Sequence, residues 1–187
     1  MISLVEEPMT LEEFIGSKYF HDGGWELFRG ELVAMSPARP AHEYVIPRLA
    51  HLLQDLFEKE KCGCVVFGSS VRVQIDDEDT FFMPDLSVSC NERDVFKNYY
   101  SRVPDVVVEV TSKSTKKYDF VDKLEVYRAN GAVEYWIIDL DEREMTVFDF
   151  KNKTHKIFGL YDEVKSEFLP GFRYKVCDIM GLLHTLK

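Results

Sequence analysis

The stretch PDVVVEVTSKST, residues 104–115, places an aspartate, a glutamate and a lysine four residues apart. Carboxylates near a lysine suit metal-dependent hydrolysis of a phosphodiester, because carboxylates hold the ion and a cation stabilises charge on the phosphate. The apolar run predicts a strand. Residues four apart on a strand share a face but lie about 13 Å apart, whereas metal–oxygen bonds are about 2.1 Å long. Asp105 and Glu109 therefore cannot bind one ion together.

Glu109 still needs an explanation, because it interrupts an apolar run over 106–110. A buried carboxylate must be paired, bound to a cation, or neutral. Metal binding would satisfy this requirement, and so would a solvated or salt-bridged position at the end of the strand. A partner for metal binding is Asp85, which follows Pro84 in the strand-like run FFMPDLSVSC. Adjacent strands are about 4.8 Å apart, so opposed carboxylates on them can bind one ion.

The candidate cation is a lysine beyond the strand. Lys113 and Lys116 follow the strand directly, where we expect them to be in solvent. Lys123 lies on a predicted helix, with Asp119 four residues before it and Tyr127 four residues after it on one face. This face borders the apolar stripe, so Lys123 can reach over the sheet toward a strand end. The alternative is an ordinary surface pair between Asp119 and Lys123.

The remaining pattern predicts a mixed α/β (α+β) fold. Thr10 and Glu13 have capping-box spacing, and Arg29-Gly30 is a hairpin signal. Apolar residues recur at helical intervals over 42–63 and 114–131, and the second helix is a crossover that would make its flanking strands parallel. Helices between strands indicate a mixed sheet with a helix on each face. The predicted strands are 64–75, 81–90, 105–110, 132–140, 144–150 and 153–160, with a terminal helix over 178–186.

Composition limits the class of protein. A chain of 187 residues with 45% hydrophobic residues predicts a single folded domain, 1–187. No apolar run approaches the ~20 residues that span a bilayer, and the acidic start of the chain is unlike a secretory signal, so we expect a cytoplasmic protein. The net charge of −10 disfavours non-specific binding to nucleic acid. It does not exclude such binding, because a bound divalent cation would offset carboxylates locally.

The four cysteines give no metal pattern. Cys62 and Cys64 form C-x-C, whereas Cys90 and Cys177 stand alone. No second close pair completes a zinc site, so a zinc protein built on cysteines and histidines is disfavoured by the spacing. We expect reduced thiols in or near a core, where free cysteine is often found.

The segments MPDLSV, PDVVVEVTSKST and YDFVDKLEVYRANGAVEYWIID, with WELFRGELVAMSP and then His42, resemble the PD-(D/E)XK nuclease superfamily. Within it they are most similar to the Uma-type putative restriction endonuclease family, and the resemblance covers most of the chain. It implies a restriction-endonuclease-like core: a mixed sheet of four to five strands flanked by helices on both faces, with extra C-terminal strands here. It also implies Mg²⁺ or Mn²⁺ between Asp85 and Glu109, with the main-chain carbonyl of Val110 as a further ligand.

The resemblance implies further site residues. An early acidic residue often joins the metal site, and Glu31 is the first candidate, with Glu26 second. His42 matches the family's histidine in either a supporting or a purely structural role. The superfamily's lysine, two residues after its acidic residue, is replaced here by Thr111. Lys123 would then supply the ammonium from the helix, with Asp119 supporting it.

Two functions follow as hypotheses. The first is a divalent-metal-dependent endonuclease that hydrolyses phosphodiester bonds in nucleic acid, DNA being favoured, with homodimerisation plausible by analogy. The second is a nuclease-like fold that no longer cuts and acts as a binding or regulatory module. The net charge and Thr111 favour the second.

Overall fold

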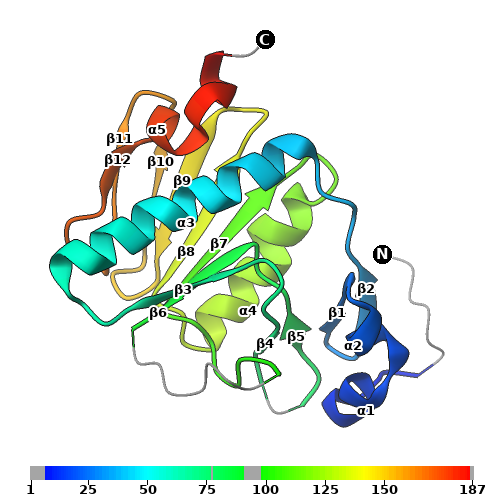
Figure 1. Cartoon of the computed structure of the whole chain (residues 1–187). Helices are drawn as coiled ribbons and strands as arrows, with labels where there is room; N and C mark the ends of the chain where they lie inside the picture. Colours follow the sequence, from blue (N-terminus) through cyan, green and yellow to red (C-terminus); the bar gives the residue numbers. More distant parts are fainter. Residues whose placement is uncertain (1–6, 77, 91–97, 186–187) are drawn as a thin grey trace.

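The computed structural model describes residues 7–76, 78–90 and 98–185. Its central feature is a six-stranded mixed sheet, shown in Figure 1, in which only β7 and β8 pair in parallel. The expected core of four to five strands is extended to six, because the expected extra C-terminal strands continue the same sheet. In sheet order the strands are β10 (Thr154–Phe158), β9 (Glu144–Asp149), β8 (Glu134–Asp139), β7 (Val106–Thr111), β6 (Leu86–Ser89) and β3 (Val65–Gly68).

The two central strands are buried along their whole length. Every residue of β7 and β8 is buried, which agrees with their near-continuous apolar sequences, because parallel strands are covered on both faces. The crossover between them contains a π-helix (Tyr118–Lys123), labelled η1, and α4 (Leu124–Ala129). The predicted parallel pairing is confirmed, with Val106 opposite Glu134 and Thr111 opposite Asp139.

Helices cover the two faces of the sheet. In Figure 1, α3 (Pro40–Glu60) crosses one face and α4 lies against the other. Leu49 and Leu53 of α3 pack in one apolar cluster with Val108 and Trp136, whereas Tyr127 of α4 packs in a second cluster on the opposite face. The C-terminal elements join the α3 side. They are β11 (Glu163–Lys165), β12 (Arg173–Lys175), α5 (Val176–Met180) and the 3₁₀ turn η2 (Gly181–Thr185).

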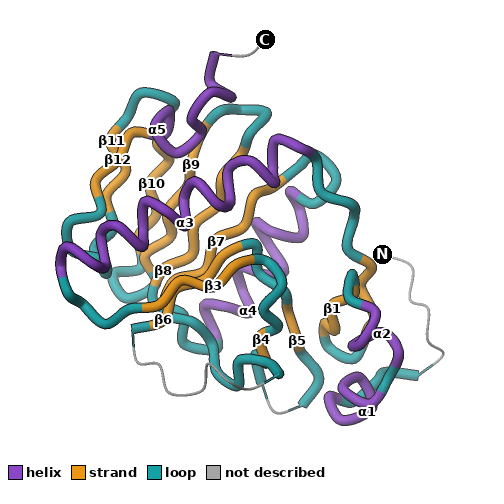
Figure 2. Tube along the Cα trace, viewed as in Figure 1, coloured by secondary structure: helices purple, strands orange, loops and turns teal. Residues whose placement is uncertain are grey.

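A second sheet carries the N-terminal part of the chain. Figure 2 shows its strands beside α4, away from β9 and β10. The predicted strand 64–75 divides between the two sheets, since β3 joins the central sheet and β4 (Val73–Gln74) joins this one. The helix start at Thr10 has the predicted capping box. In order the strands are β2 (Glu31–Ala34), β1 (Trp25–Phe28), β5 (Phe81–Phe82) and β4 (Val73–Gln74), preceded in the chain by α1 (Leu11–Gly16) and α2 (Lys18–Asp22).

The turn between β1 and β2 fixes the register of that hairpin. Arg29 and Gly30 both have positive φ angles, of 51° and 78°, as a tight two-residue hairpin turn requires. A Cβ at Gly30 would lie 2.7 Å from the Cβ of Pro8, so only glycine fits there. The predicted hairpin is confirmed, with Glu26 opposite Val33 and Phe28 opposite Glu31.

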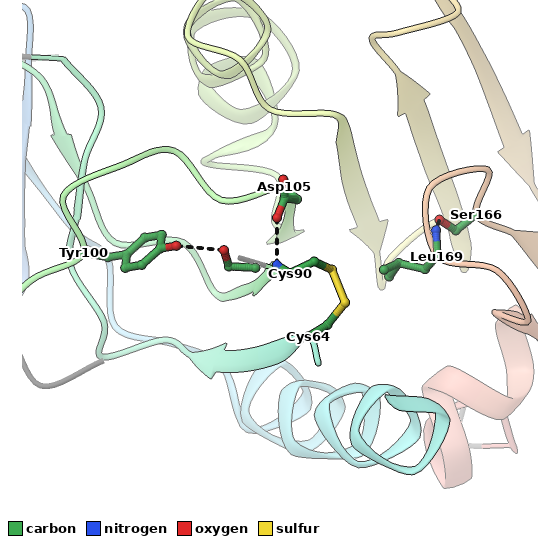
Figure 3. Close-up of a disulfide and its surroundings, with 7 residues drawn as sticks. Cys64, Cys90, Tyr100, Asp105, Ser166 and Leu169 are labelled. Atoms are coloured by element: carbon green, nitrogen blue, oxygen red, sulfur yellow. Dashed lines mark hydrogen bonds between the residues drawn. A yellow bond between two sulfur atoms is a disulfide. The ribbon is translucent and has the colours of Figure 1, made fainter. Parts of the chain in front are cut away.

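The expectation of reduced thiols is wrong for two of the four cysteines. Cys64 and Cys90 form a disulfide, shown in Figure 3, whereas Cys62 and Cys177 are free. Val65 pairs with Ser89 across β3 and β6, so the next residues outward, Cys64 and Cys90, face each other at the end of the pair. Residues that oppose each other on antiparallel strands have adjacent side chains. This pairing depends on strand register, which the cysteine spacing does not reveal.

We expect loss of this disulfide to lower the free energy of unfolding by about 3 kcal/mol, because it closes a loop in the unfolded chain. The two cysteines are 26 residues apart. Urea denaturation with and without reductant, and of Cys64→Ser, measures the effect. The matched control is Cys62→Ser, which removes an exposed free thiol. Equal denaturation midpoints for the oxidised and reduced chains would contradict the prediction.

Within the described residues, no helix has both the length and the apolar character needed to span a membrane.

Candidate metal-dependent nuclease site

Asp85 and Glu109 meet at one end of the central sheet. Leu86 of β6 pairs with Val108 of β7, and continuing this antiparallel register by one residue places Asp85 opposite Glu109. The Val110 amide donates to Asp85 Oδ2 at 2.7 Å, which holds the aspartate across the end of β7. Both residues are buried: Asp85 is 8% exposed and Glu109 is 4% exposed. The structure thus brings together the two acidic residues that strand spacing had suggested as partners.

Lys123 reaches the same point from the crossover helix. Its ammonium donates to Glu109 Oε1 at 2.9 Å and to Glu26 Oε1 at 2.9 Å. The lysine is 4% exposed, and its Nζ lies 5.4 Å from the ring centroids of both Phe82 and Tyr118. The alternative of a solvated surface pair with Asp119 is therefore wrong, because Lys123 is buried against two glutamates.

The early acidic residue at this site is Glu26 and not Glu31. Glu26 is 2% exposed, and besides Lys123 it accepts hydrogen bonds from the Met83 amide at 2.9 Å and the Tyr118 hydroxyl at 3.3 Å. Glu31 begins β2 as an exposed residue beyond the hairpin turn. The sequence could not separate the two glutamates, because which one faces the central sheet depends on how the hairpin docks.

Asp119 and Thr111 fasten the start of the crossover helix to β7. Thr111 Oγ1 lies 3.4 Å from Thr115 Oγ1, the Asp119 amide donates to the Thr115 carbonyl at 2.9 Å, and the Tyr135 hydroxyl donates to the Asp119 carbonyl at 3.1 Å. Thr111 occupies the position of the superfamily's lysine, and here it anchors the helix. The predicted helix contains a π-helical segment over Tyr118–Lys123 before it continues as α4. π-Helical segments are frequent at functional sites. No sequence pattern predicted this one.

His42, in the first turn of α3, contacts Asp85, the aspartate that is a candidate metal ligand. Its Nε2 lies 2.9 Å from Asp85 Oδ2, and its Nδ1 lies 3.5 Å from Glu43 Oε1. Burial alone would lower the pKa of His42, but the hydrogen bond and charge of Asp85, with a smaller effect of Glu43, raise it above its usual value. This contact lets His42 restrict the orientation of the Asp85 carboxylate, as expected of a residue that supports the site.

The site gathers more buried acidic side chains than its single buried ammonium can pair with. Burial raises the pKa of Glu109 well above its usual value; Lys123 opposes this shift, whereas the charges of Asp85, Asp119 and Glu26 add to it. Burial acts to lower the pKa of Lys123, but Glu109 and Glu26 outweigh it and keep the ammonium protonated. A divalent cation is the natural means of compensating such an excess of carboxylates.

The donor atoms suit a Mg²⁺ ion that keeps some of its waters better than an ion enclosed entirely by protein ligands. Asp85 and Glu109 contact other described residues through Oδ2 and Oε1, which leaves Asp85 Oδ1 and Glu109 Oε2 free among the described residues. The Val110 carbonyl points to the same side of β7 as its amide, toward Asp85. In the described ranges, no three His, Cys, Asp or Glu residues are grouped to hold a metal. Mg²⁺ typically takes one or two carboxylates and keeps several waters.

Asp105 lies at the other end of β7 and takes no part in this arrangement. Its Oδ2 accepts the Cys90 amide at 2.8 Å, beside the disulfide (Figure 3). The exclusion of Asp105 from an ion shared with Glu109 therefore agrees with the structure.

The same fold, a mixed sheet with helices on both faces, occurs in a solved structure. The crystal structure of "a putative nuclease belonging to DUF820" from Anabaena variabilis superposes with a TM-score of 0.79, over 94% of this chain and 99% of that one, at 18% identity. The family model "Uma2: Putative restriction endonuclease" matches residues 11–179. The chain therefore belongs to the Uma2 family, as the sequence motifs indicated.

A curated relative is similar over part of the chain. It is the Synechocystis sp. protein described as "Uncharacterized protein slr1290", 29% identical over 113 residues. The match covers 60% of this chain and 58% of that protein, so the chain spans little more than half of the relative's length.

Proposed function

We propose that the protein is a divalent-metal-dependent endonuclease that hydrolyses phosphodiester bonds in nucleic acid, DNA being favoured. The observation that carries this proposal is the position of Asp85 opposite Glu109, with the ammonium of Lys123 2.9 Å from Glu109. Membership of a family described as "Putative restriction endonuclease" supports it.

Each residue has a distinct part in the proposed reaction. Asp85, Glu109 and the Val110 carbonyl would hold Mg²⁺ or Mn²⁺, which when bound polarises the scissile phosphate and lowers the pKa of a water. Lys123 would orient the attacking water and stabilise charge developing on the phosphate. His42 keeps Asp85 in place, since it contacts the same oxygen that accepts the Val110 amide.

Glu26 explains how Glu109 can serve a metal while paired with Lys123. The ammonium contacts both glutamates at 2.9 Å. If Glu109 turns toward an ion, Lys123 keeps Glu26 as its partner, so no buried charge is left alone. Glu26 is itself held by Met83 and Tyr118, so it acts as a fixed support for the lysine.

Cleavage assays test the proposed function. Supercoiled plasmid and single-stranded DNA and RNA are incubated with Mg²⁺ or Mn²⁺, and with EDTA as the metal-free control. We expect nicked or shortened products only with metal, and none from Asp85→Asn. Metal-dependent products that persist at an unchanged rate in Asp85→Asn would show that the nuclease activity does not come from this site.

A binding or regulatory module remains the competing function, because Lys123 is fully paired and Thr111 stands in the usual lysine position. Calorimetric titration with Mn²⁺ separates the two. The nuclease proposal predicts a dissociation constant below millimolar, since the two carboxylates are already aligned. Absence of binding below millimolar, together with no cleavage, would establish the module as the better account.

A further inference from the structure

We propose that the exit segment, residues 112–117, binds the phosphate backbone of the nucleic-acid strand that enters the site, through Lys113 and Lys117. The inference rests on the proposed nuclease function and names the surface that would receive the substrate. It concerns electrostatic contact with phosphates, independent of base sequence.

The exit segment is a folded turn fastened to the site. It follows Thr111, two residues beyond Glu109 on β7. The Ser112 amide donates to Thr115 Oγ1 at 3.0 Å, and the Lys116 amide donates to the Ser112 carbonyl at 2.8 Å. The Thr115 carbonyl in turn accepts the Asp119 amide at 2.9 Å. The lysines are therefore presented from a hydrogen-bonded turn that directly follows the strand carrying Glu109.

Two of the three lysines in the segment are available for a ligand. Lys116 is committed, because its Nζ donates to Asp139 Oδ2 at 2.8 Å and this hydrogen bond raises its pKa. Lys113 and Lys117 are exposed. Neither forms an ion pair with any residue in the described part of the chain. Their ammonium groups are therefore available to bind an anion.

The charge of the protein makes such a contact necessary for the proposed substrate. The chain has a net charge of −10, and the site itself gathers carboxylates, so a polyanion is repelled unless cations lie close by. Phosphate neutralisation by lysine and arginine supplies most non-specific affinity for nucleic acid. Lysine binds phosphate as a point charge, which suits a strand that must be held without regard to its bases.

A second pair of exposed lysines lies at the end of the sheet opposite the site and provides a matched control. Lys151 and Lys153 are exposed in the turn after β9. Asp149 at the end of β9 pairs with Glu134, which pairs with Val106 at the start of β7. Glu109 lies toward the opposite end, so this turn is remote from the site.

The salt dependence of binding tests the inference. Fluorescence anisotropy of a labelled DNA duplex is measured over a range of NaCl concentrations, with Ca²⁺ in place of Mg²⁺ to avoid cleavage. For Lys113→Ala/Lys117→Ala we expect the slope of log K against log salt to become shallower by about 2 units, because two phosphate contacts are lost. Lys151→Ala/Lys153→Ala, with the same change in net charge, should keep the wild-type slope. Lys113→Arg/Lys117→Arg should also keep it.

The outcomes separate this inference from the proposed function. Equal slopes for the wild type and Lys113→Ala/Lys117→Ala, with retained cleavage, would overturn the inference and leave the nuclease proposal standing. Equal losses in both alanine pairs would also overturn it, because net charge alone would then account for binding. No wild-type binding or cleavage at any salt concentration would overturn both. Circular dichroism of each variant checks that the fold is intact.

Discussion

Glu109→Gln is expected to lower the rate of metal-dependent cleavage by more than about 100-fold, because replacing residues that merely support metal ligands already costs about 10- to 100-fold. Glutamine has the same shape but lacks the charge that would hold the ion opposite Asp85. The fold should tolerate the change. The pKa of Glu109 is raised by burial and by neighbouring carboxylates, so a neutral side chain is electrostatically acceptable there, and Lys123 keeps Glu26 as its partner.

The prediction is checked by initial rates of plasmid nicking and by thermal melting of the same samples. Glu31→Gln is the matched control, since it makes the same chemical change at an exposed glutamate of the same N-terminal hairpin that carries Glu26. We expect it to retain both activity and melting temperature. An active Glu109→Gln would show that Glu109 does not hold the metal. An inactive Glu31→Gln would show that Glu31, and not Glu26 alone, takes part in the site.

Lys123→Met is expected to lower the free energy of unfolding by about 3–5 kcal/mol, because removing one partner of a buried pair leaves an uncompensated charge. Two carboxylates, Glu26 and Glu109, would lose their common ammonium. Methionine has a similar length and is apolar, so the loss reports on charge more than on packing. Cleavage should be lost as well, since Lys123 is the only ammonium that contacts Glu109 in the described structure.

Urea denaturation measures this effect, and Lys116→Met provides the comparison. Lys116 also forms a 2.8 Å ion pair, with Asp139, but its side chain is 45% exposed, and exposed pairs contribute only about 0–1 kcal/mol. The double variant Glu26→Gln/Lys123→Met should recover part of the lost stability, because one of the two stranded charges is removed. If Lys123→Met and Lys116→Met shift the denaturation midpoint equally, the buried pair does not stabilise the fold as the structure implies.

The sequence by itself determined the local elements and which acidic residues could share an ion. Apolar runs predicted β7 and β8, and the helix between them predicted their parallel pairing, because a crossover connection follows from chain geometry alone. Strand spacing excluded Asp105 and directed attention to Asp85 on the preceding strand. These conclusions follow from distances within one segment or between adjacent segments, which the sequence fixes closely.

Only the tertiary structure decided which side chains meet. Glu26 and not Glu31 contacts Lys123, because the docking of the second sheet selects one face of the β1–β2 hairpin. Cys64 meets Cys90 through the register of β3 and β6. Lys123 is buried between two glutamates through a π-helix that changes which helical residues face the sheet. Each of these contacts joins separate elements of the chain, and the relative placement of those elements depends on the packing of the whole core.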